Sequence, residues 1–225
     1  GSSGISAGYA TEIPPHNIDE IIKGAIYRIN HPNCTLDKIM EIIPGPDFPT
    51  GAIIQDDGNI KEAYKSGKAK IIVKSKTEIV ETQKCNQLVI TELPYNVVKS
   101  ALVKKMSEVY VAKNIDGILD IRDESDRHGL RIVVDIKKDV NAEYIRDFFF
   151  KSTELQVNYS FNMVAIVNKK PMTIGILPML DAYIAHQKEV ILRRTHFDLE
   201  TAKLLGVKLT EWHIEDEMLY DDAPK

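Results

Sequence analysis

Two stretches of this 225-residue sequence carry side chains whose types and spacing could do chemistry. The first is a run of lysines between residues 61 and 76, in which Glu62 is the only acid. Ammonium groups neutralise phosphates and position a protein on a nucleic acid with little sequence preference. A solvated edge strand that uses lysines to prevent aggregation has the same composition, so both interpretations stay open. The lysines are Lys61, Lys65, Lys68, Lys70, Lys74 and Lys76.

The second stretch is the N-terminal GSSGISAG, in which one branched apolar side chain, Ile5, lies among glycines and serines. Nothing in the first dozen residues is typical of a buried element, and the glycines indicate a flexible loop. Apolar side chains on protruding elements can enter between base pairs and kink a duplex. Taken alone, the residues favour a buried loop anchor or the remnant of an expression tag over such a wedge.

Catalytic motifs are absent from the sequence, which has no GxGxxG, no P-loop and no GxSxG. Two pairs, His186 with Glu189 and His213 with Glu217, have the spacing of metal ligands on a helix. Two ligands on a charged helix face do not make a metal site, so we interpret both pairs as solvated side chains. The residues therefore predict no catalytic residue and no metal ligand in this chain.

A cluster of carboxylates in RDESDRHGLR is a further metal candidate, because Asp123, Glu124 and Asp126 are ligands of the type that Mg²⁺ prefers. Three arginines bracket these acids and can pair with them, and Gly129 suits a tight turn. The stretch therefore predicts a charged hairpin tip rather than a magnesium site.

The totals are those of an ordinary globular chain, with 44% hydrophobic and 28% charged residues. The net charge of −4 argues superficially against a nucleic-acid partner, but acids are concentrated in residues 203–225 and bases cluster upstream. No run of about 18 apolar residues and no secretory signal occurs. Cys34 and Cys85 have no metal or redox spacing, so we expect a cytosolic protein with incidental thiols and no membrane span.

The elements that position these residues follow from caps and periodicity. Asn17 is placed to cap a helix in which isoleucines and an alanine recur at helical spacing over residues 18–29. Thr35 is placed to cap a second helix, which the prolines of PGPDFPT end after Ile43. A short strand, a helical turn and a longer strand follow, at residues 52–55, 60–66 and 69–76.

The longer strand has two different faces. Ile71 and Val73 share one face, while Lys70, Ile72 and Lys74 share the other, because side chains alternate along a strand. The lysines at positions 68 and 76 extend the second face. We therefore expect a basic face with one apolar residue in its middle.

From residue 86 the elements alternate regularly and predict a β-α-β-β-α-β unit of the ferredoxin-like kind. An RNA-recognition module has the same order but stacks bases on aromatic residues of its third strand. The corresponding stretch, GLRIVVDIK, has no aromatic residue, so RNA binding is disfavoured. The expected elements are strands at 86–93, 117–122, 129–137 and 155–167, with helices at 96–113, capped by Asn96, and 142–151.

A long helix is expected after the unit, beginning near Pro178 and running without a helix breaker to Gly206. At about 1.5 Å per residue it is on the order of 40 Å long, which exceeds the needs of a small domain. A helix of this length usually connects a domain to something else.

Six stretches of the sequence together resemble the A subunits of bacterial type IIA DNA topoisomerases, in that family's order, from residue 1 to about residue 203. Within the family, GISAGYATEIPPHN and PTGAIIQ are more similar to topoisomerase IV than to gyrase. The stretches are GSSGISAGYATEIPPHNIDEII, IPGPDFPTGAIIQ, ITELPYNVVKSALVKKM, RDESDRHGLRIVVDIKKD, LQVNYSFNMVAI and HQKEVILRRTHFDLETAK.

The resemblance implies an α+β fold: a tower (shoulder) domain containing the ferredoxin-like unit, followed by a helix that starts a coiled coil. The implied parts are a DNA-intercalating loop at 1–16, the tower at 17–175, the coiled-coil helix at 176–205 and a divergent acidic tail at 206–225. It also implies that GSSG is native sequence. The tail, LLGVKLTEWHIEDEMLYDDAPK, departs from the basic helix that the family has there.

The resemblance also implies a role for the two stretches. Ile5 matches the isoleucine that intercalates into the bent gate segment of double-stranded DNA, with Ser3 and Gly4 beside it, and the lysine face would support the DNA. The catalytic tyrosine, found in an R-Y-T context on a winged-helix domain, has no counterpart among the tyrosines here. The resemblance further implies that the B subunit uses Mg²⁺ and ATP and that the A subunit forms homodimers.

The function implied is thus that of a DNA-bending, non-catalytic piece of an ATP-dependent topoisomerase, in the bacterial cytoplasm and associated with the nucleoid. The corresponding region of gyrase is an alternative within the family. An alternative from another class is a protein-interaction scaffold, in which the ferredoxin-like unit and the long helix mediate assembly.

Overall fold

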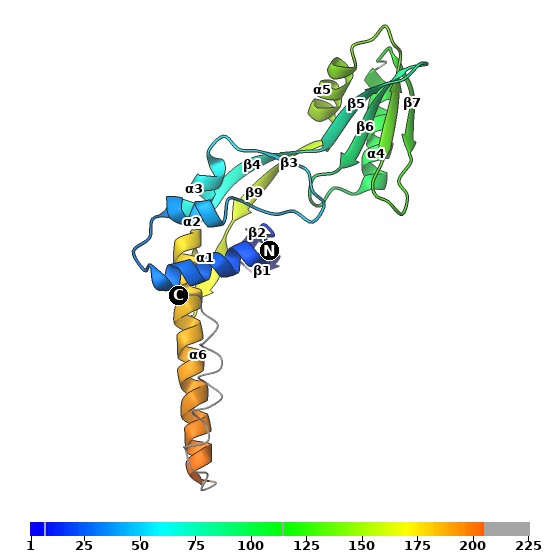
Figure 1. Ribbon diagram of the computed structural model, residues 1–225. Helices are drawn as coiled ribbons and strands as arrows, with labels where there is room; N and C mark the ends of the chain where they lie inside the picture. Colours follow the sequence, from blue (N-terminus) through cyan, green and yellow to red (C-terminus); the bar gives the residue numbers. More distant parts are fainter. Residues whose placement is uncertain (7, 114, 205–225) are drawn as a thin grey trace. The chain divides into compact units, whose positions relative to one another are not determined.

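The computed structural model describes residues 1–6, 8–113 and 115–204 (Figure 1). The chain divides into two compact units, Gly1–Met179 and Leu180–Lys225. The strands of the described residues all lie in the first unit, and helix α6 (Ile176–Leu204) runs across the division into the second. The predicted acidic tail at 206–225 and the pair His213 and Glu217 lie outside the described residues. Within those residues, no helix is both long and apolar enough to cross a membrane.

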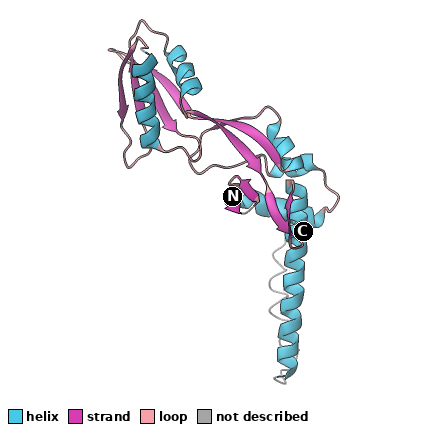
Figure 2. Ribbon diagram, turned by 180° about the vertical axis from the view of Figure 1, so that it is seen from behind, coloured by secondary structure: helices cyan, strands magenta, loops and turns pink. Residues whose placement is uncertain are grey.

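A five-stranded antiparallel sheet carries the N-terminal stretch and three of the six candidate lysines, with strands in the order β1-β2-β9-β4-β3. Helices α1, α2 and α3 lie in the sequence between strands β2 and β4 of this sheet (Figures 1 and 2). The bounds are β1 (Ser2–Ser6), β2 (Tyr9–Ile13), β3 (Ile53–Gln55), β4 (Lys68–Lys74), β9 (Gln156–Asn162), α1 (Ile18–Asn30), α2 (Leu36–Ile42) and α3 (Asn59–Ser66).

The N-terminal stretch forms a β-hairpin rather than the irregular loop expected from its glycines. β1 and β2 pair antiparallel over five residues each, from Ser2 opposite Ile13 to Ser6 opposite Tyr9. Gly8, at the turn, has φ +82°, a left-handed conformation that glycine adopts without strain. Serine, threonine and isoleucine side chains suit the exposed strands, so the glycines loosen the turn without preventing pairing.

A four-stranded antiparallel sheet in the order β5-β6-β8-β7 is built from the middle of the chain, with α4 and α5 against one face (Figure 2). Leu88, Ile90, Ile132 and Val134 point from the strands into a buried cluster, where they meet Phe149 of α5. Because side chains alternate between the two faces of a strand, every second residue of β6 and β8 contributes to this core. The bounds are β5 (Lys76–Glu81), β6 (Asn86–Glu92), β7 (Ile118–Asp123), β8 (Ile132–Ile136), α4 (Lys99–Lys113) and α5 (Ala142–Ser152).

The expectation that residues 155–167 supply the fourth strand of the ferredoxin-like unit is wrong. β9 pairs along all seven of its residues with β4, in the other sheet, and β5 takes the edge beside β6. The physical reason lies at Ser75, which alone separates β4 from β5, so one continuous segment supplies a strand to each sheet. The Ser75 N–H donates to Leu155 O at 2.8 Å and aligns β9 with β4.

Several element boundaries also differ from expectation. Asn96 does not cap α4: it has φ +68° in a turn closed by a hydrogen bond from Val97 N–H to Pro94 O, and the helix begins at Lys99. The predicted strand at 155–167 is interrupted at Met163, after which β10 (Val164–Val167) pairs with β11 (Lys170–Thr173). The cap at Asn17 is confirmed, because its side chain accepts from Asp19 N–H at 2.9 Å.

The helix predicted over residues 18–29 is confirmed, but its apolar stripe is only partly covered. Gly24 is buried, since a Cβ there would lie 2.6 Å from a side-chain carbon of Ile43. Ile21 is partly buried, and the other four isoleucines of the stripe are half or more exposed. These are Ile18, Ile22, Ile26 and Ile29.

We predict that Phe149→Ala lowers the free energy of unfolding by about 3–5 kcal/mol, because a fully buried ring leaves a cavity in the cluster under the four-stranded sheet. Urea denaturation measures the change. Tyr144→Ala, on the same helix and with a side chain 65% exposed, is the matched control and should change stability by less than about 1 kcal/mol. Equal effects of the two variants would contradict the placement of Phe149 in the core.

Candidate nucleic-acid interface

The β1–β2 hairpin presents Ile5 to solvent. Its side chain is 93% exposed, although it lies within a strand and pairs in register with Ala10. Gly4 adds no side chain next to it, and the Ser3 hydroxyl donates to a carboxylate oxygen of Glu12 at 2.6 Å. The structure thus holds one apolar side chain away from the protein on a short, regular support, which is not a buried loop anchor.

Glu12 links this hairpin to the rest of the sheet. Its second carboxylate oxygen accepts from the Tyr159 hydroxyl at 2.7 Å, so one side chain connects β1, β2 and β9. Burial and this hydrogen bond raise the pKa of Tyr159 above its usual range, and the hydroxyl therefore stays protonated and donates. Asn162 adds a donor to Ala10 O at 2.6 Å. The attachment of the hairpin is therefore mainly polar.

The end of the hairpin is fixed to α3 through His16. Its Nδ1 lies 2.8 Å from Pro14 O, which can only accept, so Nδ1 carries the proton. Burial lowers the pKa of His16, and in the neutral ring Nε2 accepts from the Tyr64 hydroxyl at 2.8 Å. The hairpin is thus connected to the helix that carries two of the candidate lysines, Lys61 and Lys65.

The basic face predicted for β4 is present. Ile71 and Val73 are buried, while Lys68, Lys70 and Lys74 alternate with them on the opposite face. Within the described part of the chain, Lys68 and Lys70 form no ion pair and are exposed. The Lys74 ammonium lies 5.9 Å from the centre of the Phe150 ring, a weak cation–π contact. Three of the six candidate lysines therefore share one sheet face.

The other candidate lysines lie elsewhere. Lys61 forms an ion pair with Asp37 at 2.5 Å, and Lys65 is exposed on α3 without an ion pair among residues 1–6, 8–113 and 115–204. Lys76 begins β5 in the four-stranded sheet and pairs with Glu92 at 3.1 Å. Because Lys76 is paired with β6 in the four-stranded sheet, it does not extend the basic face of β4 as expected.

A row of polar side chains on β9, which was not predicted from the sequence, borders the basic face. In the antiparallel register Lys70 is opposite Ser160, Ile72 is opposite Asn158, and each pair shares a face of the sheet. Tyr159 is buried on the other face. The signal in LQVNYSFN is an alternation of polar and apolar residues, which predicts a strand but does not reveal the neighbour of that strand.

A groove of about 570 Å³ lies between the hairpin and β9. It is lined by Ile5 and its neighbours on β1 and β2, by Asn158 and Ser160 on β9, and by the turn at 95–97. β2 pairs with β9 at Asn162 alone, so the rest of this edge of β9 is open towards the groove. Hairpin and strand thus form the walls of one concave surface.

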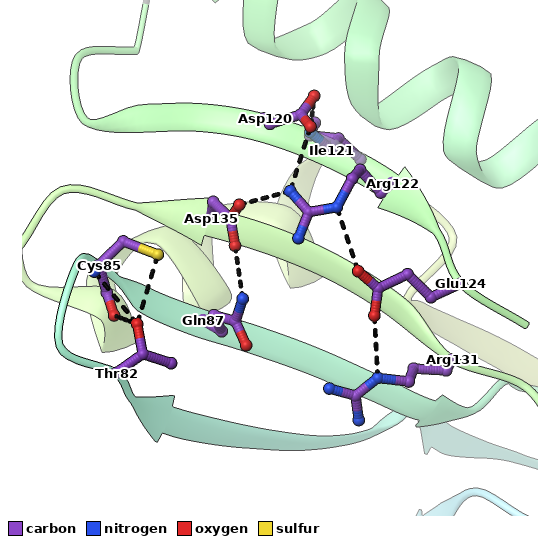
Figure 3. A network of polar contacts seen from close by, with 9 residues as sticks. All are labelled: Thr82, Cys85, Gln87, Asp120, Ile121, Arg122, Glu124, Arg131 and Asp135. Carbon is purple, nitrogen blue, oxygen red and sulfur yellow. Dashed lines mark hydrogen bonds and ion pairs between the residues drawn. The ribbon is translucent and has the colours of Figure 1, made fainter.

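The charged hairpin tip between β7 and β8 is confirmed and is a network of ion pairs (Figure 3). Arg122 lies between Asp120, Glu124 and Asp135, and Glu124 also accepts from Arg131 at 3.1 Å. The guanidinium of Arg122 holds the pKa of Asp135 below its usual range. Within the described residues, no three side chains of metal-binding type come together in a geometry that could hold a metal ion.

Comparison with known proteins shows the family to which the chain belongs. The family model for the A subunits of DNA gyrase/topoisomerase IV matches residues 1–216. The chain is 55% identical over 204 residues to the A subunit of DNA topoisomerase 4 from Streptococcus pneumoniae, and 52% identical over 205 residues to its counterpart from Bacillus subtilis. Each match covers 90% of this chain and 25% of the relative.

The chain therefore belongs to the family of DNA gyrase/topoisomerase IV A subunits. Within this family, its similarity is to topoisomerase IV A subunits, which are parts of type II topoisomerases. The chain spans about a quarter of the length of these relatives.

We predict that Glu12→Ala loosens the hairpin, because it leaves the buried Tyr159 hydroxyl without its acceptor and frees Ser3. An unsatisfied buried donor costs about 1–3 kcal/mol. Amide hydrogen exchange of β1 and β2 should accelerate, and Tyr159→Phe in the same chain should recover part of the loss, as a double-mutant cycle reports for coupled side chains. Glu62→Ala, an exposed acid on α3, is the control. Exchange rates in the hairpin equal to those of the control would rule out this role for Glu12.

The pH dependence of stability should reveal the ion pair between Asp123 and Lys99, whose charged atoms lie 2.7 Å apart. Hydrogen bonds from Lys99 and Ser125 lower the pKa of Asp123 from 3.8 to about 2. Because the folded-state pKa is the lower one, the contribution is present above about pH 4 and is lost as the pH falls towards 2.

Asp123→Asn, which keeps an oxygen for Ser125, should therefore be less stable than the parent at pH 6, and the difference should vanish near pH 2. Thermal denaturation at several pH values measures this difference. Asp139→Asn changes an exposed carboxylate without an ion pair in the described chain and should show no such trend. A pH-independent difference for Asp123→Asn would exclude the ion pair as its cause.

Proposed function

We propose that this chain is the DNA-bending tower region of the A subunit of a topoisomerase IV, and that it helps to hold the gate segment during ATP-dependent double-strand passage. The observation that carries the proposal is the 93% exposure of Ile5 on a hairpin beside a face with three lysines. The reaction in this proposal is decatenation and relaxation of double-stranded DNA, as the family resemblance implies.

Ile5 acts as a wedge in this proposal. An exposed isoleucine loses its unfavourable contact with water when it enters between two base pairs, which offsets part of the unstacking energy of a few kcal/mol per step. A bend also lets more of the duplex reach the protein, and smooth bending of a short site costs about 1–6 kcal/mol. Contacts from the ammonium groups on β4 compensate for that cost.

Catalysis is assigned to other parts of the enzyme. The tyrosines of this chain lack the R-Y-T context. The family resemblance implies that the nucleophile lies on a winged-helix domain of the parent protein. The B subunit provides Mg²⁺ and ATP chemistry, and two copies of the A chain form a homodimer, with α6 starting the coiled coil. The assembly works in the bacterial cytoplasm on the nucleoid, and this region by itself is inactive.

The corresponding region of gyrase is the alternative within the family, and a protein-interaction scaffold is the alternative outside it. The exposed isoleucines of α1 favour the scaffold, because they leave an apolar helix surface for a partner. Salt dependence separates DNA binding from the scaffold: affinity for DNA that does not weaken as salt rises would favour the scaffold over phosphate contacts.

We predict that Ile5→Ala in the full-length protein lowers the ratio of bent to straight duplex in the complex about tenfold, because losing about 1.4 kcal/mol of wedge contact changes that equilibrium constant by this factor. Energy transfer between dyes at the two duplex ends measures bending, and DNA cleavage with the B subunit should fall in parallel.

Ile29→Ala is the matched control, since it removes another exposed isoleucine, 52% exposed on α1. It should leave bending and cleavage unchanged. Unaltered bending and cleavage for Ile5→Ala would count decisively against the wedge. Because Ile5 is exposed, its truncation should leave the fold intact, so a decrease in bending reports the lost contact with DNA.

A further inference from the structure

Strand β9 lies between the Ile5 hairpin and the basic face of β4, and its exposed side chains have no role so far in the proposed DNA contact. In the five-stranded sheet β9 lies between β2, which belongs to the Ile5 hairpin, and β4, which carries the lysines. A duplex that touches both the hairpin and β4 has to pass over β9. The side chains that β9 presents there therefore matter for the contact.

Those side chains are neutral and polar. Asn158 and Ser160 are exposed, and their side chains make no hydrogen bond to protein within the described part of the chain. Their orientation is fixed, because the alternate residues Tyr159 and Phe161 are buried on the opposite face. Rotation of the strand to hide Asn158 would expose these rings, so the two donors stay on the surface.

The surroundings of the two side chains favour a phosphate backbone over a protein segment. Ser160 is opposite Lys70, and both Asn158 and Ser160 line the groove that Ile5 also lines. An amide N–H and a hydroxyl donate well to phosphate oxygens. Tyr95, Val97 and Val157 give the same groove apolar lining as well. The choice of a phosphate backbone over a peptide therefore rests on the lysines that β4 presents on the face shared with Asn158 and Ser160.

We infer that Asn158 and Ser160 are neutral hydrogen-bond donors to the DNA phosphate backbone and form a contact between the Ile5 hairpin and the β4 lysines. This inference rests on the proposed function, since it requires that DNA occupies the same face of the sheet. Neutral donors add affinity without releasing counterions, so the salt dependence of binding identifies them.

The test uses the full-length protein and a short fluorescent duplex, with affinity measured by anisotropy at several salt concentrations. Asn158→Ala combined with Ser160→Ala should weaken binding about five- to tenfold at every salt concentration, because two neutral hydrogen bonds are lost. The slope of log K against log salt should not change. Asn158→Lys should strengthen binding and steepen the slope by about one.

Two comparisons make the outcome decisive. Asn33→Ala combined with Ser100→Ala removes the same side-chain types from exposed positions outside β9 and should have no effect on binding. Lys68→Ala combined with Lys70→Ala should weaken binding and reduce the slope by about two. Thermal denaturation verifies that each variant is folded.

The results separate failure of this inference from failure of the proposed function. If the lysine variant loses affinity and slope while the Asn158 and Ser160 variant matches its control, only the inference about β9 is overturned. It is overturned as well if the double alanine variant changes the slope. If neither the lysine variant nor Ile5→Ala affects the DNA complex, the proposed function itself fails.

Discussion

The arrangement depends most on the pairing of β9 with β4. Seven consecutive residues of each strand are in antiparallel register, from Lys68 opposite Asn162 to Lys74 opposite Gln156. Since directly opposed residues share a face, this single register separates a buried apolar layer from a surface of lysines, amides and a hydroxyl. A slip by one residue would bury the polar row and expose Tyr159 and Phe161. The basic face, the polar row and the position next to the hairpin are therefore set together.

The junction at Ser75 connects this surface to the four-stranded sheet. One chain segment passes from β4 to β5 through a single buried serine, and β9 begins next to the same point, where Leu155 O accepts from Ser75 N–H. Glu92 adds a second connection, because it accepts from Ala52 N–H at 2.6 Å and from Lys76 at 3.1 Å. The backbone donor is the main cause of the lowered pKa of Glu92. The lysine at the end of the predicted basic run is thus used to hold two segments together.

Charged side chains form ion pairs in some regions of this protein and are unpaired in others. In the β7–β8 tip, Glu124 is paired with arginines and Asp123 with Lys99, and Lys61 and Lys76 are likewise paired with carboxylates. Among the described residues, the unpaired lysines include those on the outer face of β4. A chain with an overall negative charge can therefore still present a basic surface, since screening limits the influence of distant acids to about 10 Å.

The sequence by itself determined the local features. These are the alternation that buries Ile71 and Val73 on the face opposite the lysines, the cap at Asn17, the charged tip between β7 and β8, and Ile5 as a single apolar residue among polar ones. Each depends on residues close together in the chain, where periodicity and side-chain type decide the outcome. The family resemblance added the topoisomerase assignment, which the comparisons confirm.

Only the tertiary structure decided which strands pair. In the structure β9 is not part of the predicted ferredoxin-like unit, and β5 occupies the expected position of that strand. Lys76 lies in the four-stranded sheet, and the N-terminal stretch is a hairpin held by Glu12 and Tyr159. The physical reason is that alternation specifies which face of a strand is buried, whereas strand partners are selected by packing and backbone hydrogen bonds between segments far apart in the sequence.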